Sequence, residues 1–307
     1  MAAASDKARA SVRRARPLLG TFVEIEADGA AGAERGAAVE AAFDAVADVH
    51  RLMSFHEPDS DVSRLNREAR LRPVVVHDWT YQVLQAAVDL SRRSAGVFNI
   101  AVAPALQARG LLPRVGGDAA AGDAALPHDA IELLPGGAVR FRKQDVRIDL
   151  GGIAKGFAVD RARDALARFD VASGIVNAGG DLAVFGSAPH TVHLRDPRDP
   201  RRLICSIALA NAALASTGRR FDPSRSVETE DSTVINPATG LPSTALAGCS
   251  VRASSCMIAD ALTKVVMILG TDAGELLAHY GAGALLMFPN GDSQMTPNLS
   301  DSINRAA

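Results

Sequence analysis

Two glycine-rich turns, one on each side of an expected helix, carry the residues with the clearest chemical use. Residues 148–160 read as an apolar strand that ends at Asp149, a glycine pair, and a helix that contains Lys155. Glycines let a bulky ligand approach the backbone, and a helix N-terminus offers unpaired amide hydrogens to phosphate. The second turn has the sequence Asn-Ala-Gly-Gly-Asp and supplies Asn177, Gly179 and Gly180. Together the two turns favour a nucleotide site.

The first turn does not match the common nucleotide motifs. Its Gly-Gly-x-x-x-Gly spacing differs from the dinucleotide fingerprint, and the Gly-Lys-Ser/Thr of a P-loop is absent. A strand, a turn and a helix without any ligand would explain the glycines alone. However, the chain has only four lysines among its 33 basic residues, and Lys155 falls in this turn. The second glycine cluster and Asp149 further favour the nucleotide site over the purely structural reading.

A second motif, residues 259–264, places Asp260 and Lys264 four positions apart on an expected helix. Read as an exposed ion pair, it contributes only about a few tenths of a kcal/mol. Its neighbours are apolar, however, which places the pair at the edge of a core where charges need partners. A carboxylate oxygen suits Mg²⁺, and a lysine ammonium can neutralise phosphate as a point charge. The motif therefore predicts a second part of the same site.

Composition excludes several other classes of site. The formal net charge is −2, with acids and bases interspersed, which argues against a nucleic-acid partner. The seven histidines do not cluster, so neither a zinc site nor a Ser–His–Asp triad is supported. Three cysteines without metal-ligand spacing are typical of unpaired thiols in a reducing compartment.

The expected elements alternate short strands with helices, which indicates an α+β fold with mixed, largely antiparallel sheets and packed helices. We expect Ser60 or Asp61 to cap a short helix, Asp78 to cap a longer one, and Gly96 to end the latter in a left-handed cap. Helices are expected at residues 33–53, 153–169, 259–269 and 272–280. Strands are expected at residues 21–27, 139–141, 146–150, 174–177, 182–185, 192–194, 204–209 and 284–288.

One domain is expected over residues 17–290. Residues 1–16 are predicted to be a disordered basic leader, residues 113–127 a mobile loop, and residues 291–307 a loose polar tail. No apolar run is long enough for a membrane span or a signal-peptide core. We therefore expect a cytoplasmic protein, or a periplasmic one if its true start differs.

In this order, the motifs resemble those of the ApbE family, the FAD:protein FMN transferases. The resemblance covers about residues 18–288, and the stretch around Asp149 is its most specific part. It implies an ApbE-like (T-fold-like) architecture that holds FAD between the two halves of the chain. The matching segments are residues 19–21, 54–55 with Ser60, 63–66, 96–99 through Pro104, 148–160, 177–181, 236–240 and 259–262.

The resemblance also implies the chemistry and the site residues. The family uses Mg²⁺ on the diphosphate of FAD and transfers FMN to a Thr or Ser of a target flavoprotein. By position, Asp149 would bind the adenosine end, and backbone Gly152 and carboxylate Asp260 would hold the metal. The other positions that the resemblance assigns to FAD contact are Phe55, Tyr81, Lys155 and Val234.

The chain departs from the family pattern at several site positions. Thr233 stands where the family commonly has the His suspected to deprotonate the attacking hydroxyl, so no catalytic base is assigned. Lys264 replaces a Thr that helps hold magnesium. The remaining departures, Asn99, Arg219 and Asn236, each replace an acidic residue. The site is therefore expected to be more cationic, with Lys264 and Arg219 doing part of the work of the metal.

Three functions follow as alternatives. The first is an FMN transferase that esterifies FMN onto a partner protein and releases AMP. The second is an FAD-binding protein without transfer activity, which the missing His favours. The third is an FAD pyrophosphatase that uses water and yields FMN and AMP.

Overall fold

The computed structural model describes residues 11–29, 32–114, 129–143, 145–169, 171–186, 189–199, 201–219, 232–300 and 303–304. The loop expected at residues 113–127 therefore lies almost wholly outside the described residues.

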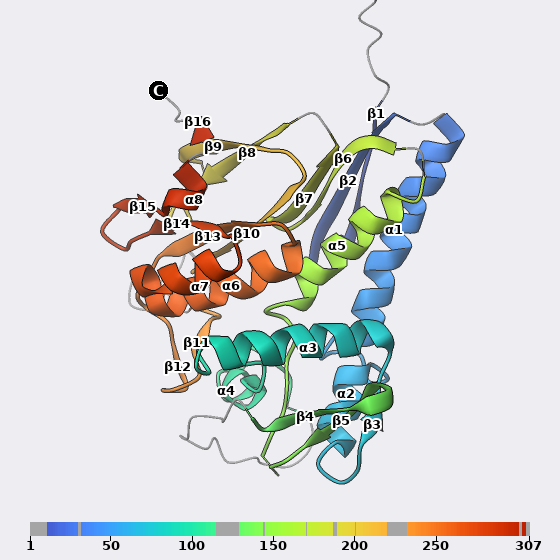
Figure 1. Ribbon diagram of the computed structural model, residues 1–307, viewed down its shortest axis with the longest axis vertical. Helices are drawn as coiled ribbons and strands as arrows, with labels where there is room; N and C mark the ends of the chain where they lie inside the picture. Colours follow the sequence, from blue (N-terminus) through green and yellow to red (C-terminus); the bar gives the residue numbers. More distant parts are fainter. Residues whose placement is uncertain are drawn as a thin grey trace, which may run out of the picture.

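A large antiparallel sheet of eight strands forms the centre of the fold, in the order β1-β2-β6-β7-β10-β13-β14-β15 (Figure 1). Neighbours that are distant in sequence pair within it, as β2 does with β6 through Val23 and Ala178. The strands are β1 (Ser11–Leu18), β2 (Thr21–Gly29), β6 (Val171–Ala178), β7 (Asp181–Gly186), β10 (Ala212–Gly218), β13 (Gly248–Ala253), β14 (Gly283–Met287) and β15 (Ser293–Met295).

Three helices cover one face of this sheet: α1 (Gly32–Met53), α5 (Ala154–Leu166) and α6 (Cys256–Leu269) (Figure 1). Alternate residues of a strand point to opposite faces, so one strand can serve two cores. In β14, Ala284 and Leu286 belong to the core under these helices, whereas Leu285 and Met287 belong to a second core.

That second core lies beneath a small sheet of β8 (His190–Arg195), β9 (Leu203–Leu209) and β16 (Ile303–Asn304). The C-terminal part continues from α6 through η3 (Gly270–Ala273) and α7 (Gly274–His279) to β14, and ends with α8 (Pro297–Ser300).

A second part of the molecule lies below the large sheet in Figure 1. It contains α2 (Asp61–Glu68), α3 (Asp78–Arg93) and α4 (Ala103–Ala108). A small sheet completes it, made of β3 (Val74–Val75), β4 (Ile131–Leu134) and β5 (Ala138–Phe141). The 3-10 turn η1 (Pro135–Gly137) connects β4 to β5. The hairpin of β11 (Ile235–Asn236) and β12 (Leu241–Pro242) lies nearby.

Several local predictions are confirmed. The α+β class is present, as are the helices expected at residues 33–53, 153–169 and 259–269. The helix expected at residues 272–280 is the 3-10 turn η3 followed by the short helix α7. The side chain of Ser60 caps α2 by accepting a hydrogen bond from the Ser63 amide. Past α3, Gly96 is left-handed (φ 85°), and its amide donates to the Ser91 carbonyl. Ala95 is left-handed as well, with φ 50°.

Other local predictions are wrong. From Ser11 onward the expected leader is edge strand β1, because Ser11 to Leu18 pair in register with Asp28 to Thr21. The expected loose tail contains β15 and α8, whose Leu299 is fully buried in the second core. In the described part of the chain, residues 146–150 belong to no strand and pair with none; hydrogen bonds with the Asn66 side chain take the place of a strand partner. The cap of α3 is His77, whose ring accepts from the Trp79 amide, and Asp78 is the first helical residue.

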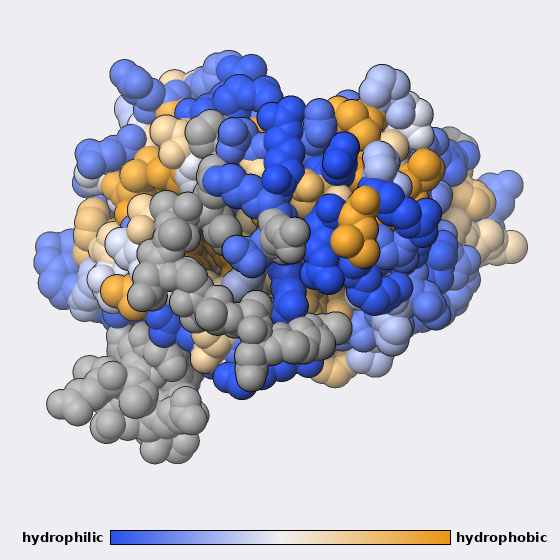
Figure 2. Space-filling model, turned by 90° about the horizontal axis from the view of Figure 1, so that it is seen from below, coloured by the Kyte–Doolittle hydropathy of each residue, from blue (hydrophilic) through white to orange (hydrophobic). Residues whose placement is uncertain are grey.

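On the face seen from below, hydrophobic groups are scattered among hydrophilic ones over the described part (Figure 2). Among the described residues, no helix has the length and apolar character needed to cross a bilayer.

Candidate functional site

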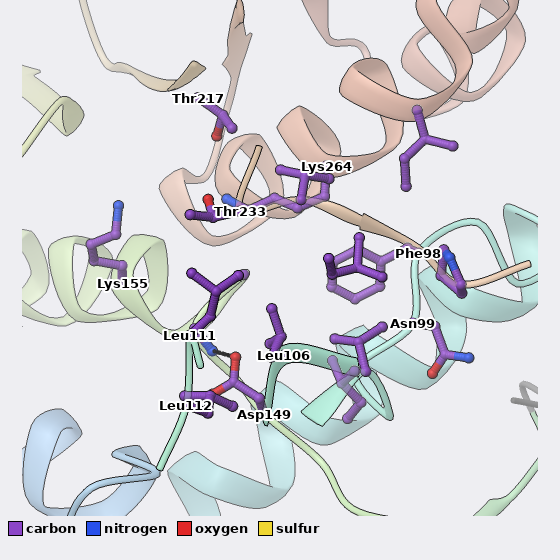
Figure 3. A pocket seen from close by; sticks show the side chains of 18 of the residues that line it. Phe98, Asn99, Leu106, Leu111, Leu112, Asp149, Lys155, Thr217, Thr233 and Lys264 are labelled. Atoms are coloured by element: carbon purple, nitrogen blue, oxygen red, sulfur yellow. Dashed lines mark hydrogen bonds between the residues drawn. The ribbon is translucent and has the colours of Figure 1, made fainter. Parts of the chain in front are cut away.

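A cavity of about 630 Å³ lies between the two parts of the molecule. One wall comes from the lower part and is mostly apolar, with Leu106, Leu111 and Leu112 in it (Figure 3). The opposite wall carries Thr217 of β10 and Lys264 of α6. A site with one apolar and one polar wall suits a ligand that joins an aromatic ring to a charged group.

A second cavity of about 390 Å³ adjoins the first. The two share Asp149, Gly151 and Lys155 in their walls, so these residues lie at the junction. Phe55 lines the second cavity, near the end of α1. The two spaces could therefore hold the two ends of a long ligand, with its middle beside Lys155.

Asp149 is held at this junction by the extended segment before it. Asn66 of α2 bonds both backbone groups of Ile148, at 2.9 Å to its oxygen and 2.8 Å from its nitrogen. The Asp149 amide donates to the Ile100 carbonyl at 2.8 Å. The carboxylate accepts from the Gly151 amide at 3.1 Å (Figure 3). Burial raises the pKa of Asp149 despite that hydrogen bond.

Lys155, in the first turn of α5, pairs with Asp181 at the start of β7, with 2.5 Å between Nζ and Oδ2. The lysine side chain is 30% exposed, whereas Asp181 is 1% exposed. Burial lowers the pKa of Lys155, but Asp181 and Asp260 outweigh it and the net shift is upward. Burial and the Asp260 charge raise the pKa of Asp181. Its Oδ1 is buried without a hydrogen-bond partner among the described residues.

Lys264 and Asp260 form the second ion pair, one helical turn apart on α6. Lys264 Nζ donates to Asp260 Oδ1, and also to the Asp260 carbonyl and Thr263 Oγ1, each at 3.1 Å. Asp260 Oδ2 accepts from the Gly156 amide at 3.0 Å. Burial alone would raise the pKa of Asp260, but the two ammonium groups lower it overall.

These contacts do not fit a metal ion on Gly152 and Asp260. Both carboxylate oxygens of Asp260 already have partners, and Asp260 is fully buried. The stem of Lys264 lies against Gly152, since a Cβ built there would be 3.4 Å from Lys264 Cε. In the part of the chain that the structure describes, no group of three His, Cys, Asp or Glu side chains could hold a metal ion.

The glycines of the first motif divide between two roles: Gly151 and Gly152 line the large cavity, whereas Gly156 serves chain packing. A Cβ at Gly156 would lie 2.2 Å from the Cys256 carbonyl oxygen, so the glycine lets α5 and α6 cross closely. Gly152 faces Lys264, as described above. Gly179 lines the large cavity but faces Thr21, which a Cβ would approach to 2.6 Å.

The other predicted residues divide between the cavities and positions away from them. Val234 and Thr233 line the large cavity. Asn177 accepts from the Gly180 amide at 2.9 Å, and both line a separate groove against β8 instead of the cavity. The Tyr81 hydroxyl donates to the Leu134 carbonyl, and Tyr81 lines none of these spaces. Arg219 donates to the Thr244 carbonyl and is not in the cavity wall.

Sequence reasoning missed the contribution of β10 and of the segment around α4. Thr217 and Gly218 end β10 at the cavity, and Thr217 Oγ1 lies 2.7 Å from Thr263 Oγ1, which contacts the Lys264 ammonium. The Ser-Thr-Gly sequence at residues 216–218 does not by itself indicate a site. Its position at the cavity follows from the pairing of β10 with β13. The leucines of the lower wall carry no motif at all.

Comparison with known proteins gives a consistent result. The model of the ApbE family matches residues 19–286. An FAD:protein FMN transferase of Treponema pallidum (strain Nichols) is 28% identical over 332 residues, covering 96% of this chain and 90% of that protein. Another, from Vibrio cholerae serotype O1, is 25% identical over 317 residues, covering 98% and 94%.

Solved structures show the same similarity in three dimensions. The ApbE protein from Thermotoga maritima superposes with a TM-score of 0.85 at 25% identity, covering 96% of this chain and 100% of that one. The flavin transferase ApbE from Vibrio cholerae gives a TM-score of 0.84 at 21% identity, covering 96% and 99%. The latter bears on the fold alone.

Proposed function

Since the chain belongs to the ApbE family, we propose that it is an FAD:protein FMN transferase. It splits FAD, attaches FMN through a phosphoester to a Thr or Ser of a target flavoprotein, and releases AMP. The observation that carries this proposal is the pair of adjoining cavities with two lysines in their walls. FAD has two aromatic ring systems joined by a diphosphate. The two cavities could hold the two ring systems, with the diphosphate beside Lys155 where the cavities meet.

The large cavity is the better place for one ring system of FAD, because Leu106, Leu111 and Leu112 give it an apolar wall. Asp149 would accept from a donor of the adenosine end, and Phe55 would pack against the ring in the smaller cavity. Lys155 and Lys264 would then face the diphosphate between them. Val234 and Gly179 complete the proposed contacts, while Tyr81, Asn177 and Gly180 have no place in them.

In the transfer step, the acceptor hydroxyl oxygen attacks the phosphorus of the FMN half. A new P–O bond forms to that oxygen, and the bond from the same phosphorus to the bridging oxygen breaks, so that AMP leaves. The two lysines stabilise the charge that develops on the phosphoryl oxygens. Thr233 cannot accept a proton at neutral pH, so the hydroxyl proton passes to water or to the departing phosphate. We therefore expect slow turnover.

Magnesium is part of what the resemblance implies, but the contacts of Asp260 and Gly152 do not fit it, so no step here runs through a metal. We also propose a cytoplasmic location. The three cysteines of the chain, Cys205, Cys249 and Cys256, are unpaired and buried, which is compatible with a reducing compartment.

The test is to incubate the protein with FAD and a candidate acceptor flavoprotein, then measure covalent flavin on that target and released AMP. Labelled target with equal AMP supports the proposal. FMN and AMP without target would identify a pyrophosphatase, and bound FAD without AMP would identify a binding protein. Lys155→Met should reduce labelling, and the exposed Lys143→Met serves as its matched control. Failure to bind FAD at all would contradict every one of these functions.

A further inference from the structure

Lys264 lies between the two residues expected to hold a metal. Its hydrocarbon stem rests on Gly152, and its ammonium is bonded to the Asp260 carboxylate. A divalent cation on Asp260 Oδ1 would have to displace the Lys264 ammonium.

The ammonium is held by more than a single ion pair. Its other two protons are matched by the Asp260 carbonyl and by Thr263 Oγ1. Thr263 is itself fixed, because its hydroxyl lies 2.7 Å from both Thr217 Oγ1 and the Asp260 carbonyl. The positive charge is therefore positioned by three oxygens of the chain before any ligand arrives.

Both ion pairs at the site share one orientation. The side chains of Lys264 and Lys155 are 20% and 30% exposed and line the cavity, whereas Asp260 and Asp181 are 0% and 1% exposed behind them. The two pairs thus present positive charge to the cavity although each pair is neutral, with Asp149 as an acid in the same lining. An anionic diphosphate in the cavity meets the two ammonium groups first.

On these contacts we infer that Lys264 is a built-in cation that replaces the divalent metal, so this chain binds the FAD diphosphate without one. The inference rests on the proposed function for the identity of the ligand. A metal added beside Lys264 would meet a like charge and would find both carboxylate oxygens of Asp260 engaged.

The first experiment uses the wild-type protein. FAD affinity is measured by flavin fluorescence in EDTA and again in millimolar Mg²⁺, and Mn²⁺ alone is titrated by calorimetry. We expect equal FAD affinity in both buffers and no stoichiometric Mn²⁺ binding. Affinity that collapses in EDTA and returns with Mg²⁺, or one tightly bound Mn²⁺ per chain, would overturn the inference.

The second experiment compares Lys264→Thr with the matched control Lys143→Thr. In EDTA, Lys264→Thr should weaken FAD binding by about tenfold or more, because a fixed charge is lost at the diphosphate. Added Mg²⁺ should restore it, since Asp260 and a hydroxyl then offer oxygen ligands. Unchanged affinity in EDTA, or no recovery with Mg²⁺, would refute the exchange of lysine for metal.

Lys264→Thr leaves the buried Asp260 carboxylate without its cation, so the variant could fail to fold. Circular dichroism establishes whether it is folded. If it does not fold, the wild-type measurements alone decide the question. Absence of FAD binding in every buffer would contradict the proposed function instead, whereas the Mn²⁺ titration would still test the metal site.

Discussion

At the scale of single residues, the site depends on which end of each ion pair faces the cavity. The spacing of Asp260 and Lys264 already predicted contact between them. Burial of both carboxylates, and partial exposure of both lysines, turns two neutral pairs into a cationic wall. Asp149 also lies at the junction, and its environment differs: among the described residues its carboxylate accepts from the Gly151 amide and no lysine is bonded to it.

The raised pKa of Asp149 gives a prediction for Asp149→Asn. The folded protein holds the Asp149 proton more tightly than the unfolded chain, so ionisation costs stability as pH rises above about 3.9. Lys264 and His56 reduce this cost without cancelling it. At pH 7 the variant should be more stable than wild type in urea unfolding and should bind FAD more weakly. The stability difference should shrink as pH falls toward about 4. A variant less stable at pH 7 would mean that the bond from the Gly151 amide dominates.

At the scale of elements, the crossing of α5 and α6 positions both lysines. Gly156 removes the side chain at the contact, and its amide binds Asp260. Asp160, one turn further along α5, accepts from the amides of Cys256 and Met257 and from the Ser255 hydroxyl. Its carboxylate therefore caps the N-terminus of α6 from a neighbouring helix.

Gly156→Ala should force the two helices apart, because its Cβ would lie 2.2 Å from the Cys256 carbonyl oxygen. We expect the free energy of unfolding to fall by about 1–3 kcal/mol and FAD binding to weaken. Gly36→Ala, in α1 with nothing within 4 Å of the new Cβ, is the control. It should stabilise the protein by about 0.5–1 kcal/mol in the same urea titration. Equal effects of the two changes would contradict the close crossing.

Asp160→Ala should lower the free energy of unfolding by about 2 kcal/mol, since one buried and two partly buried donors at the start of α6 lose a charged acceptor. Asp164→Ala, on the same helix, is the comparison, because its 37% exposed side chain pairs with the arginines Arg161 and Arg163 of its own helix and caps no other element among the described residues. That change should cost less than about 1 kcal/mol. Chemical denaturation of both variants measures the difference, and a cost at Asp160 no larger than at Asp164 would argue against the cap.

At the scale of the whole molecule, the cavity is a space between two parts that share one core. Helices α1 and α5 belong to the same continuous core as Leu65 of α2 and Leu84 of α3, so the lower wall is anchored to the sheet. A ligand between the parts should therefore stabilise the molecule as one unit.

FAD at one hundred times its dissociation constant should raise the free energy of unfolding by about 2.7 kcal/mol. Because the ligand contacts both parts, hydrogen exchange should slow both around α4 and at the end of β10. Mg²⁺ alone, as a control, should leave unfolding unchanged. Protection limited to one part would show that the ligand does not bridge the cavity.

The long helices could be predicted because a hydrophobic repeat within one segment is enough to define them. The strands β10 and β13 could not, because Ala-, Ser- and Gly-rich segments lack a clear alternation and are fixed by their neighbours. The segment at residues 146–150 has a strand-like composition, yet the side chain of Asn66 bonds it in place of a strand. Strand β1 resembled a basic leader because an edge strand keeps one side open to water.

The sequence by itself determined the α+β class, the nucleotide-type motifs and the contact between Asp260 and Lys264, because each depends on residues close together in the chain. Only the tertiary structure decided that Asp181 pairs with Lys155, that Asp160 caps α6 and that Tyr81 lies outside the cavity. It also decided that the Lys264 side chain spans Gly152 and Asp260. The contacts of the two lysines and of Asp160 depend on how closely α5 and α6 pack against each other and on the sheet, and the position of Tyr81 depends on its bond to Leu134. No local sequence pattern encodes these distances.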